Sequence, residues 1–165
     1  MNNLLFSIIV FWSFTSISYP QSSINFTVND INGEEIVFSS LLEKGPVMLA
    51  FWRSWCPSCK EEQKAMQELY EKYKSSGFEY IGINVDNQKS VSKVKAYVAA
   101  HNFTFKVILD TDKKIFEMCG GIDEAMPYSL TVDKNGDIIS TRIGFKSGDE
   151  HFIEEEIKVM LGLKQ

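Results

Sequence analysis

Three nearly continuous apolar runs constrain the fold of this chain more than any other feature of its sequence. They lie at 47–52, 79–85 and 105–109, and their length and composition are typical of parallel strands that are covered on both faces. The segments 57–76 and 90–101, which separate these runs, carry apolar residues at helical spacing. Strands that alternate with helices in this way predict right-handed βαβ units in a single domain.

The last third of the chain predicts a hairpin and a closing helix. Lys134-Asn135-Gly136 lies between the apolar runs 128–132 and 137–143, and Asn-Gly supplies the positive φ angles that a tight hairpin turn needs. Residues 149–161 place their apolar side chains on one side of a helix. The fold class is therefore α/β, with a central mixed β-sheet that is parallel first, ends in an antiparallel hairpin and is flanked by helices.

The first 29 residues contain no charged side chain, and the first charge is Asp30. An apolar run from Leu4 to Trp12 is followed by the small residues of Ser16-Ile17-Ser18, as in a secretory signal peptide. We therefore predict a signal peptide over residues 1–18 and a mature domain over residues 19–165. The alternative is an uncleaved N-terminal membrane anchor. Both interpretations predict that the rest of the chain is exported. It would lie in the periplasm or another extracytoplasmic space, or would be secreted if the source is eukaryotic.

The charge and cysteine content narrow the classes of function. The formal net charge of −5 and the absence of any run of five like charges argue against a nucleic-acid partner, because phosphate binding needs a basic surface. Three cysteines in 165 residues are too few for a small domain stapled by disulfides. Redox chemistry and metal binding remain.

Two of the cysteines form the motif Cys56-Pro57-Ser58-Cys59, which follows the first apolar run and begins the helix at 57. A thiol at a helix N-terminus faces free backbone N–H groups and the positive end of the helix dipole, which lower its pKa. Pro57 suits the first helical turn. We therefore predict that Cys56 is the exposed attacking thiol and that Cys59 is the resolving thiol.

Two other interpretations of the motif, a zinc site and a structural disulfide, are less favoured. A zinc site needs four ligands, and the remaining candidates, Cys119, His101 and His151, are isolated in the sequence, so no metal site is predicted. A purely structural disulfide is disfavoured by the position of the pair in the first turn of a helix.

Three stretches of the chain resemble one known family. The stretch 51–62, which holds Trp55, the cysteine pair and Glu62, resembles the active-site signature of exported thiol–disulfide oxidoreductases of the TlpA/ResA type, in the thioredoxin superfamily. Residues 24–45 resemble the N-terminal extension of that family, and 127–136 resemble its cis-proline loop, strand and hairpin. The resemblance spans residue 24 to the end. It implies a thioredoxin-like fold with an N-terminal β extension and implies no cofactor.

Glu62 is the third candidate catalytic residue. The inward side of its helix is predicted to carry Cys59, Glu62, Met66, Leu69 and Tyr73. A carboxyl group that is partly buried beside a thiol has a raised pKa and can exchange a proton with that thiol near neutral pH. The alternative is a solvated helix charge, which describes Glu61 better. The resemblance implies that Glu62 tunes the thiols, and Ala50 stands where ordinary thioredoxins carry a buried Asp.

The residues expected to bind substrate are Trp55, Pro57, Met126 and Pro127. The sequence alone predicts a trans Met126–Pro127 bond. The resemblance implies a cis bond, a Pro127 that lies against the cysteine pair, and a Met126 backbone that pairs with the substrate. Trp52 and Trp55 are expected to pack over the thiols and shield them. Cys119 is expected to be a small buried hydrophobic residue, and the alternatives are a second resolving thiol or an intermolecular link.

The predicted function is that of an exported thiol–disulfide oxidoreductase that reduces protein disulfides, in cytochrome c maturation or general periplasmic thiol reduction. The reverse direction would use the same residues. Its expected partners are protein thiols or disulfides and an upstream electron-donor thiol protein. It is expected to be a monomer that meets the membrane only if the N-terminal segment is uncleaved.

Two alternative functions share this fold. Copper or zinc carriers of this fold have three residues between their cysteines and a distant His ligand, unlike this chain. A thiol peroxidase needs a Thr three residues before the reactive cysteine, where Arg53 stands.

Overall fold

The computed structural model describes residues 24–122 and 125–163. The predicted signal peptide, residues 1–18, lies outside the described residues, and so does its boundary with the mature domain at residue 19.

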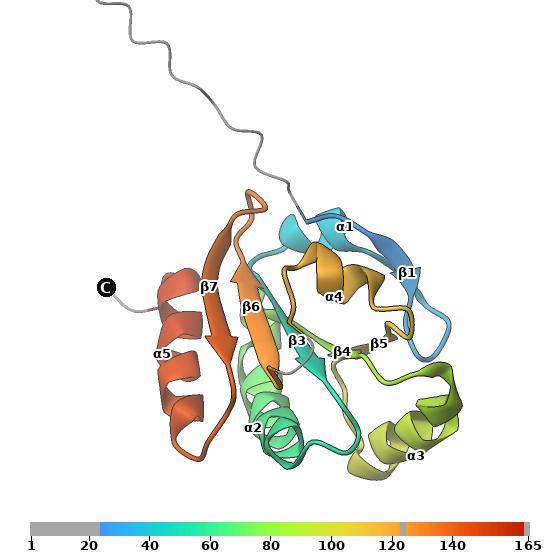
Figure 1. Cartoon of the computed structure of the whole chain (residues 1–165). Helices are drawn as coiled ribbons and strands as arrows, with labels where there is room; N and C mark the ends of the chain where they lie inside the picture. The colour runs from blue at the N-terminus through green and yellow to red at the C-terminus, as the bar shows by residue number, and fades with distance from the viewer. Residues whose placement is uncertain (1–23, 123–124, 164–165) are drawn as a thin grey trace, which may run out of the picture.

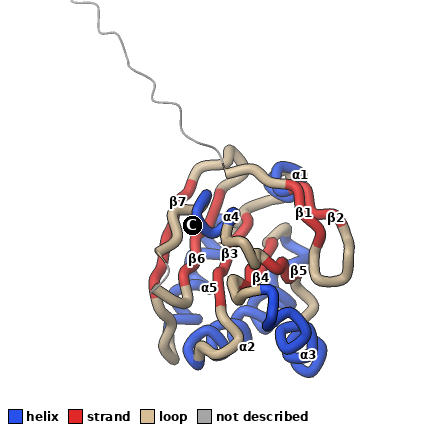
Figure 2. The backbone as a smooth tube through the Cα atoms, turned by 45° about the vertical axis from the view of Figure 1, so that its right-hand side comes forward, coloured by secondary structure: helices blue, strands red, loops and turns tan. Residues whose placement is uncertain are grey.

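In the described ranges, one mixed β-sheet forms the centre of the molecule (Figure 1). Its strands have the order β5-β4-β3-β6-β7, and their bounds are Val47–Trp52 for β3, Glu79–Asn84 for β4, Lys106–Leu109 for β5, Tyr128–Val132 for β6 and Ile138–Ile143 for β7. The β3–β4 and β4–β5 pairs are parallel, whereas β3–β6 and β6–β7 are antiparallel. Figure 2 shows the strands in red with the helices in blue around them. The predicted fold class is confirmed.

Helices cover both faces of this sheet. One face carries α2 (Pro57–Tyr73), α3 (Val91–His101) and α5 (Asp149–Met160), and the other carries α1 (Phe38–Leu42) and α4 (Lys114–Met118). Short 3-10 turns, η1 (Lys74–Ser76) and η2 (Gln88–Ser90), follow α2 and precede α3. The three long helices match the predicted segments closely. The helix α1 was not predicted, because its five residues are too few to show a helical period.

The strand β3 explains why its sequence is apolar throughout. Alternate side chains of a strand point to opposite faces, and all six residues of β3 are buried. Leu49 and Phe51 belong to the cluster under α1 and α4, whereas Met48 and Trp52 belong to the cluster under α2, α3 and α5.

The N-terminal ribbon covers one edge of the sheet. It pairs β1 (Thr27–Asn29) with β2 (Glu35–Val37), and the Ile31 N–H in the turn between them donates to the Val107 carbonyl of β5 at 2.8 Å. The strand β2 ends at Val37, because Phe38 begins α1 and is fully buried. In the described part of the chain, no helix has the length and apolar character needed to cross a membrane.

Candidate active site

The two cysteines of the Cys-Pro-Ser-Cys motif lie where β3 ends and α2 begins. Cys56 and Cys59 form a disulfide with an S–S distance of 2.07 Å and a Cα–Cα distance of 5.3 Å. Cys56 is the N-cap of α2, and its Sγ accepts a hydrogen bond from the Cys59 N–H at 3.2 Å. The Ser58 hydroxyl lies 3.5 Å from the same sulfur. These donors, together with the helix dipole, favour negative charge on Cys56.

The two cysteines differ in their exposure to solvent. Cys56 keeps 6% of its surface exposed and Cys59 none, so the prediction that Cys56 is exposed is wrong in degree. Cys56 is nearly covered because it packs in the apolar cluster that also holds Ala50 and Trp52, with Met126 against it. Cys56 is nevertheless the more accessible residue of the pair, which is the order that an attacking and a resolving cysteine require.

The turn before Cys56 is anchored to the end of the neighbouring strand β4. The Ser54 N–H donates to Asp86 Oδ2 at 3.0 Å, and Asn84 Nδ2 donates to the Trp52 carbonyl at 3.3 Å. Asn84 and Asp86 are both buried. The last residue of β4, Asn84, and Asp86 just after it therefore hold the turn that presents the cysteine pair.

Glu62 lies one turn after Cys59 on the buried side of α2, as predicted, and is fully buried. Burial raises the pKa of its carboxyl from 4.5 to about 8, while the Arg142 guanidinium and the Ser129 hydroxyl lower it by less. No donor in the described residues reaches hydrogen-bond geometry with either carboxyl oxygen. Roughly one tenth of such a group is ionised at pH 7, so Glu62 can both accept and return a proton.

Three small residues and Arg142 form a row across the sheet, and Ser129 and Arg142 of this row interact with Glu62. Gly82, Ala50, Ser129 and Arg142 lie opposite one another on β4, β3, β6 and β7. Above the start of this row lies Gln63, whose Oε1 would be 3.0 Å from a Cβ added at Gly82.

Sequence analysis missed three residues around Glu62. Gln63 is fully buried and donates to the Tyr80 hydroxyl at 3.0 Å, although the predicted inward stripe passed over it. Ser129 was signalled only by a hydroxyl in an otherwise apolar strand. Nothing in the sequence near Arg142 separates it from an ordinary surface charge.

The loop before β6 brings Met126 and Pro127 toward the same region. The Met126–Pro127 peptide bond is cis, as the resemblance implied and the sequence alone did not. Met126 packs against the core clusters on both faces of the sheet, including the one that contains Cys56 and Cys59. The Gly144 N–H donates to the Pro127 carbonyl at 2.7 Å and ties this loop to the end of β7.

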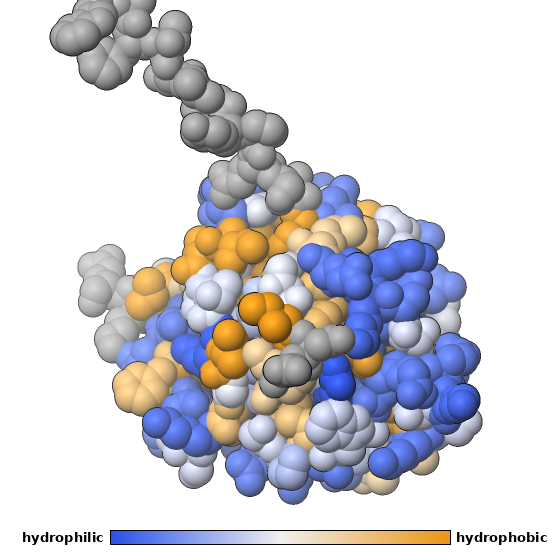
Figure 3. Space-filling view, in the orientation of Figure 1, coloured by the Kyte–Doolittle hydropathy of each residue, from blue (hydrophilic) through white to orange (hydrophobic). Residues whose placement is uncertain are grey.

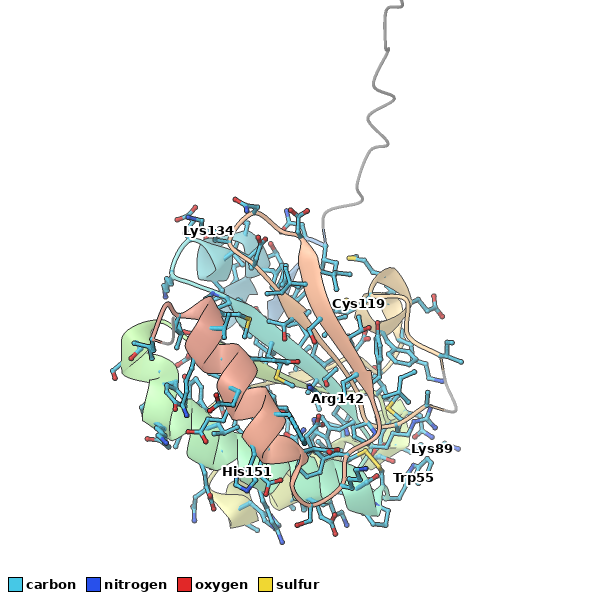
Figure 4. The ribbon with its side chains drawn as sticks, turned by 90° about the vertical axis from the view of Figure 1, so that its left-hand side faces the viewer. Trp55, Lys89, Cys119, Lys134, Arg142 and His151 are labelled. Atoms are coloured by element: carbon cyan, nitrogen blue, oxygen red, sulfur yellow. A yellow bond between two sulfur atoms is a disulfide. The ribbon has the colours of Figure 1, made fainter. Side chains whose placement is uncertain are left out.

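The two tryptophans beside the motif differ. Trp52 is fully buried, whereas Trp55 is 63% exposed, so most of the Trp55 side chain faces solvent and its packing over the thiols stays a prediction. Its ring lies in the turn between β3 and α2, with the Arg53 guanidinium 5.3 Å from the ring centroid (Figure 4). On the face of the molecule that carries β6, β7 and α4, apolar side chains reach the surface (Figure 3), and Met118, Ile122 and Ile143 are among the exposed ones.

Cys119 lies apart from this chemistry. It is buried, outside any disulfide in the described residues, and belongs to the cluster under α1 and α4. Burial and the nearby Asp110 raise the pKa of its thiol to about 12, so it stays protonated. His101 lies in the last turn of α3 and His151 on the exposed side of α5. Across residues 24–122 and 125–163, no three His, Cys, Asp or Glu side chains gather as metal ligands would.

The chain is similar in sequence to known proteins. A sequence profile of the AhpC/TSA family matches residues 21–141. The thiol-disulfide oxidoreductase ResA of Bacillus anthracis is 35% identical over 126 residues, which cover 76% of this chain and 70% of that protein. ResA of Bacillus subtilis is 33% identical over 141 residues, and the match covers 82% of this chain and 73% of that protein.

Solved structures are similar over most of the chain. StoA from Bacillus subtilis has a TM-score of 0.68 at 26% identity, and the match covers 81% of this chain and 96% of StoA. A thiol:disulfide interchange protein of the thioredoxin family from Chlorobium tepidum has a TM-score of 0.74 at 24% identity, covering 89% of this chain and all of that one. The second likeness supports the fold alone.

Proposed function

Because the chain belongs to the AhpC/TSA family and, within it, to the ResA thiol–disulfide oxidoreductases, we propose that it reduces disulfides of exported proteins through Cys56 and Cys59. The observation that carries this proposal is the cysteine pair at the N-terminus of α2 with a fully buried Glu62 one turn further on.

The reaction begins from the reduced pair. The Cys56 thiolate attacks one sulfur of the client disulfide, forms a mixed disulfide, and releases the other client sulfur as a thiolate that takes a proton from water. The Cys59 thiolate then attacks Cys56 Sγ and releases the second client thiolate. Two electrons pass from the dithiol to the client, and the Cys56–Cys59 disulfide seen in the structure is the product state.

Glu62 supplies the proton step of resolution. Cys59 is fully buried, so its thiol must lose a proton inside the protein before it can attack. The Glu62 carboxylate accepts that proton and returns it when an electron donor regenerates the dithiol. Its raised pKa suits both directions near neutral pH.

The client is bound by the surface that surrounds Cys56. Trp55 and Pro57, on either side of Cys56 in the chain, are exposed. Met126 packs against the cluster that contains Cys56, and its backbone can pair with an extended client strand. The exposed apolar side chains of Met118, Ile122 and Ile143 favour an unfolded client.

Export and partners complete the proposal. Residues 1–18 act as the signal peptide, residues 19–165 work outside the cytosol as a monomer, and an upstream thiol protein re-reduces the pair. Outside the cytosol, thiols are otherwise oxidised, so a dedicated donor is required. The favoured client is an apocytochrome c with an oxidised Cys-X-X-Cys-His motif, and general thiol reduction is the broader alternative.

Trapping a mixed disulfide tests this function. The Cys59→Ser variant lacks the resolving thiol, so Cys56 should stay covalently joined to an oxidised Cys-X-X-Cys-His peptide. Mass spectrometry should show one adduct that dithiothreitol removes. The wild-type protein, first reduced, should instead release reduced peptide and become oxidised.

The matched control is Cys56→Ser, which keeps Cys59 and Cys119. It should form no adduct. Absence of an adduct in Cys59→Ser would overturn the proposal, as would an equal amount in Cys56→Ser. An adduct of the same yield with a scrambled disulfide peptide would support general thiol reduction instead of a cytochrome client.

A further inference from the structure

Arg142 occupies the outer end of the row of small residues under α2. In that row Ala50 is opposite Gly82 and Ser129, and Ser129 is opposite Arg142. Opposed residues on neighbouring strands point to the same face of the sheet. Three members are a glycine, an alanine and a serine, so no bulky side chain of the row separates Glu62 from the edge strand.

The face to which Arg142 points is fixed by its neighbours. Tyr128 and Leu130, on either side of Ser129, belong to the cluster under α1 and α4, so Ser129 points to the α2 face. Arg142 donates from its guanidinium to Glu156 of α5 at 3.2 Å, which places its side chain on the same side (Figure 4).

Arg142 interacts with two acidic side chains that differ in their exposure. Its side chain is 22% exposed and that of Glu156 is 40% exposed, whereas Glu62 is fully buried. Charge interactions are screened far less in the interior than at the surface. One guanidinium therefore acts outward on an exposed carboxylate that it bonds and inward on a buried carboxyl that has no bonded donor in the described residues.

We propose that Arg142 is a positioning residue that keeps a fraction of Glu62 in its carboxylate form, and that Glu156 moderates it by drawing the guanidinium toward α5. This inference rests on the proposed role of Glu62 in resolution. The groups that face Glu62 are Cys59 on its own helix, Tyr80 from β4, Ser129 from β6 and Arg142 from β7. Arg142 is the cation among them, so its loss should act in one direction.

The consequence is a coupling between the surface ion pair and the thiol chemistry. Only the ionised form of Glu62 can accept the Cys59 proton. The ionised fraction of Glu62 at a given pH depends on the positive charge of Arg142 and on the negative charge of Glu156 beside it. Removing the cation should raise the Glu62 pKa, and removing Glu156 should lower it.

The test is a direct titration of Glu62 by carboxyl ¹³C NMR in the oxidised full-length protein. Glu62→Gln assigns the resonance. We expect Arg142→Gln to raise the Glu62 pKa by roughly one unit and Glu156→Gln to lower it by a smaller amount. Arg142→Lys should restore most of the wild-type value. The rate at which Cys59 resolves the mixed disulfide should also depend on pH. In reactions that start from the reduced protein, the midpoint of this dependence on the acid side should shift together with the Glu62 pKa measured by NMR.

Controls separate this inference from a folding effect and from the proposed function. Glu155→Gln removes an acid from the same helix that pairs with Lys158, and it should leave Glu62 unmoved. An unchanged Glu62 pKa in folded Arg142→Gln, or in Arg142→Lys if that variant alone folds, would overturn the inference. A protein that never reduces a disulfide would refute the proposed function, while the titration would still decide the role of Arg142.

Discussion

At the scale of single residues, the site combines two groups whose environments push their chemistry in opposite directions. Cys56 receives a backbone N–H at the start of α2, which favours its charged form. Glu62 is fully buried without a bonded donor in the described residues, which favours its neutral form. A nucleophile that ionises readily and an acid that ionises reluctantly suit a cycle in which protons and electrons move together.

Glu62 should also leave a signature in stability. Its folded pKa of about 8 exceeds its unfolded value of 4.5, so the folded state binds more protons between these pH values. The contribution of Glu62 to stability should therefore be most favourable below pH 4.5 and should be lost as the pH rises to about 8, by a total on the order of 5 kcal/mol. Denaturant unfolding of the oxidised protein and Glu62→Gln measures the difference. The free energy of unfolding of Glu62→Gln should increase relative to that of the wild type as the pH rises. A difference that does not change with pH would contradict the prediction.

At the scale of elements, the sequence predicts those parts that depend on local pattern. The six apolar residues of β3 and the helical period of α2 predict their own structures. Asn135-Gly136 predicts the β6–β7 hairpin, but of these two residues only Gly136 has a positive φ, at 87°. Contacts between distant elements are different. Arg142 meets Glu156 only because β7 pairs with β6 and α5 returns across the sheet, and no local pattern encodes that approach. The near burial of Cys56 has the same origin, since Met126 comes from seventy positions later.

A close approach between two connections gives a prediction at this scale. A Cβ added to Gly45, before β3, would lie 2.2 Å from the backbone oxygen of Gly77, before β4. Backbone cannot yield as a flexible side chain can, so Gly45→Ala should cost about 3 kcal/mol of stability, the upper part of the range for overpacking. Gly33→Ala is the control, because its φ is +89° but its Cβ would meet nothing within 4 Å. It should cost about 1 kcal/mol. Equal losses in urea unfolding would refute the clash.

At the scale of the whole molecule, one sheet holds two apolar cores. The strands β3, β4, β5 and β6 contribute side chains to the cluster beneath α1 and α4, and β3, β4 and β5 also contribute to the cluster beneath α2, α3 and α5. Because the two cores share these strands, unfolding of the sheet in one core would also expose the apolar side chains of the other. The cysteine pair and Glu62 belong to one side, while the N-terminal ribbon and α4 cover the other, so the stability of the site depends on both.

Shared strands predict a single cooperative unfolding transition. Ile36 of β2 is 2% exposed in one core, and Ile153 of α5 is 1% exposed in the other. Each replacement by Ala should cost about 2–4 kcal/mol, and the double variant should lose the sum to within about 0.5 kcal/mol, because the two sites share no partner. Far-ultraviolet circular dichroism and tryptophan fluorescence should give coincident midpoints in every variant. If Ile153→Ala shifted fluorescence but left part of the dichroism transition in place, the two cores would be unfolding separately.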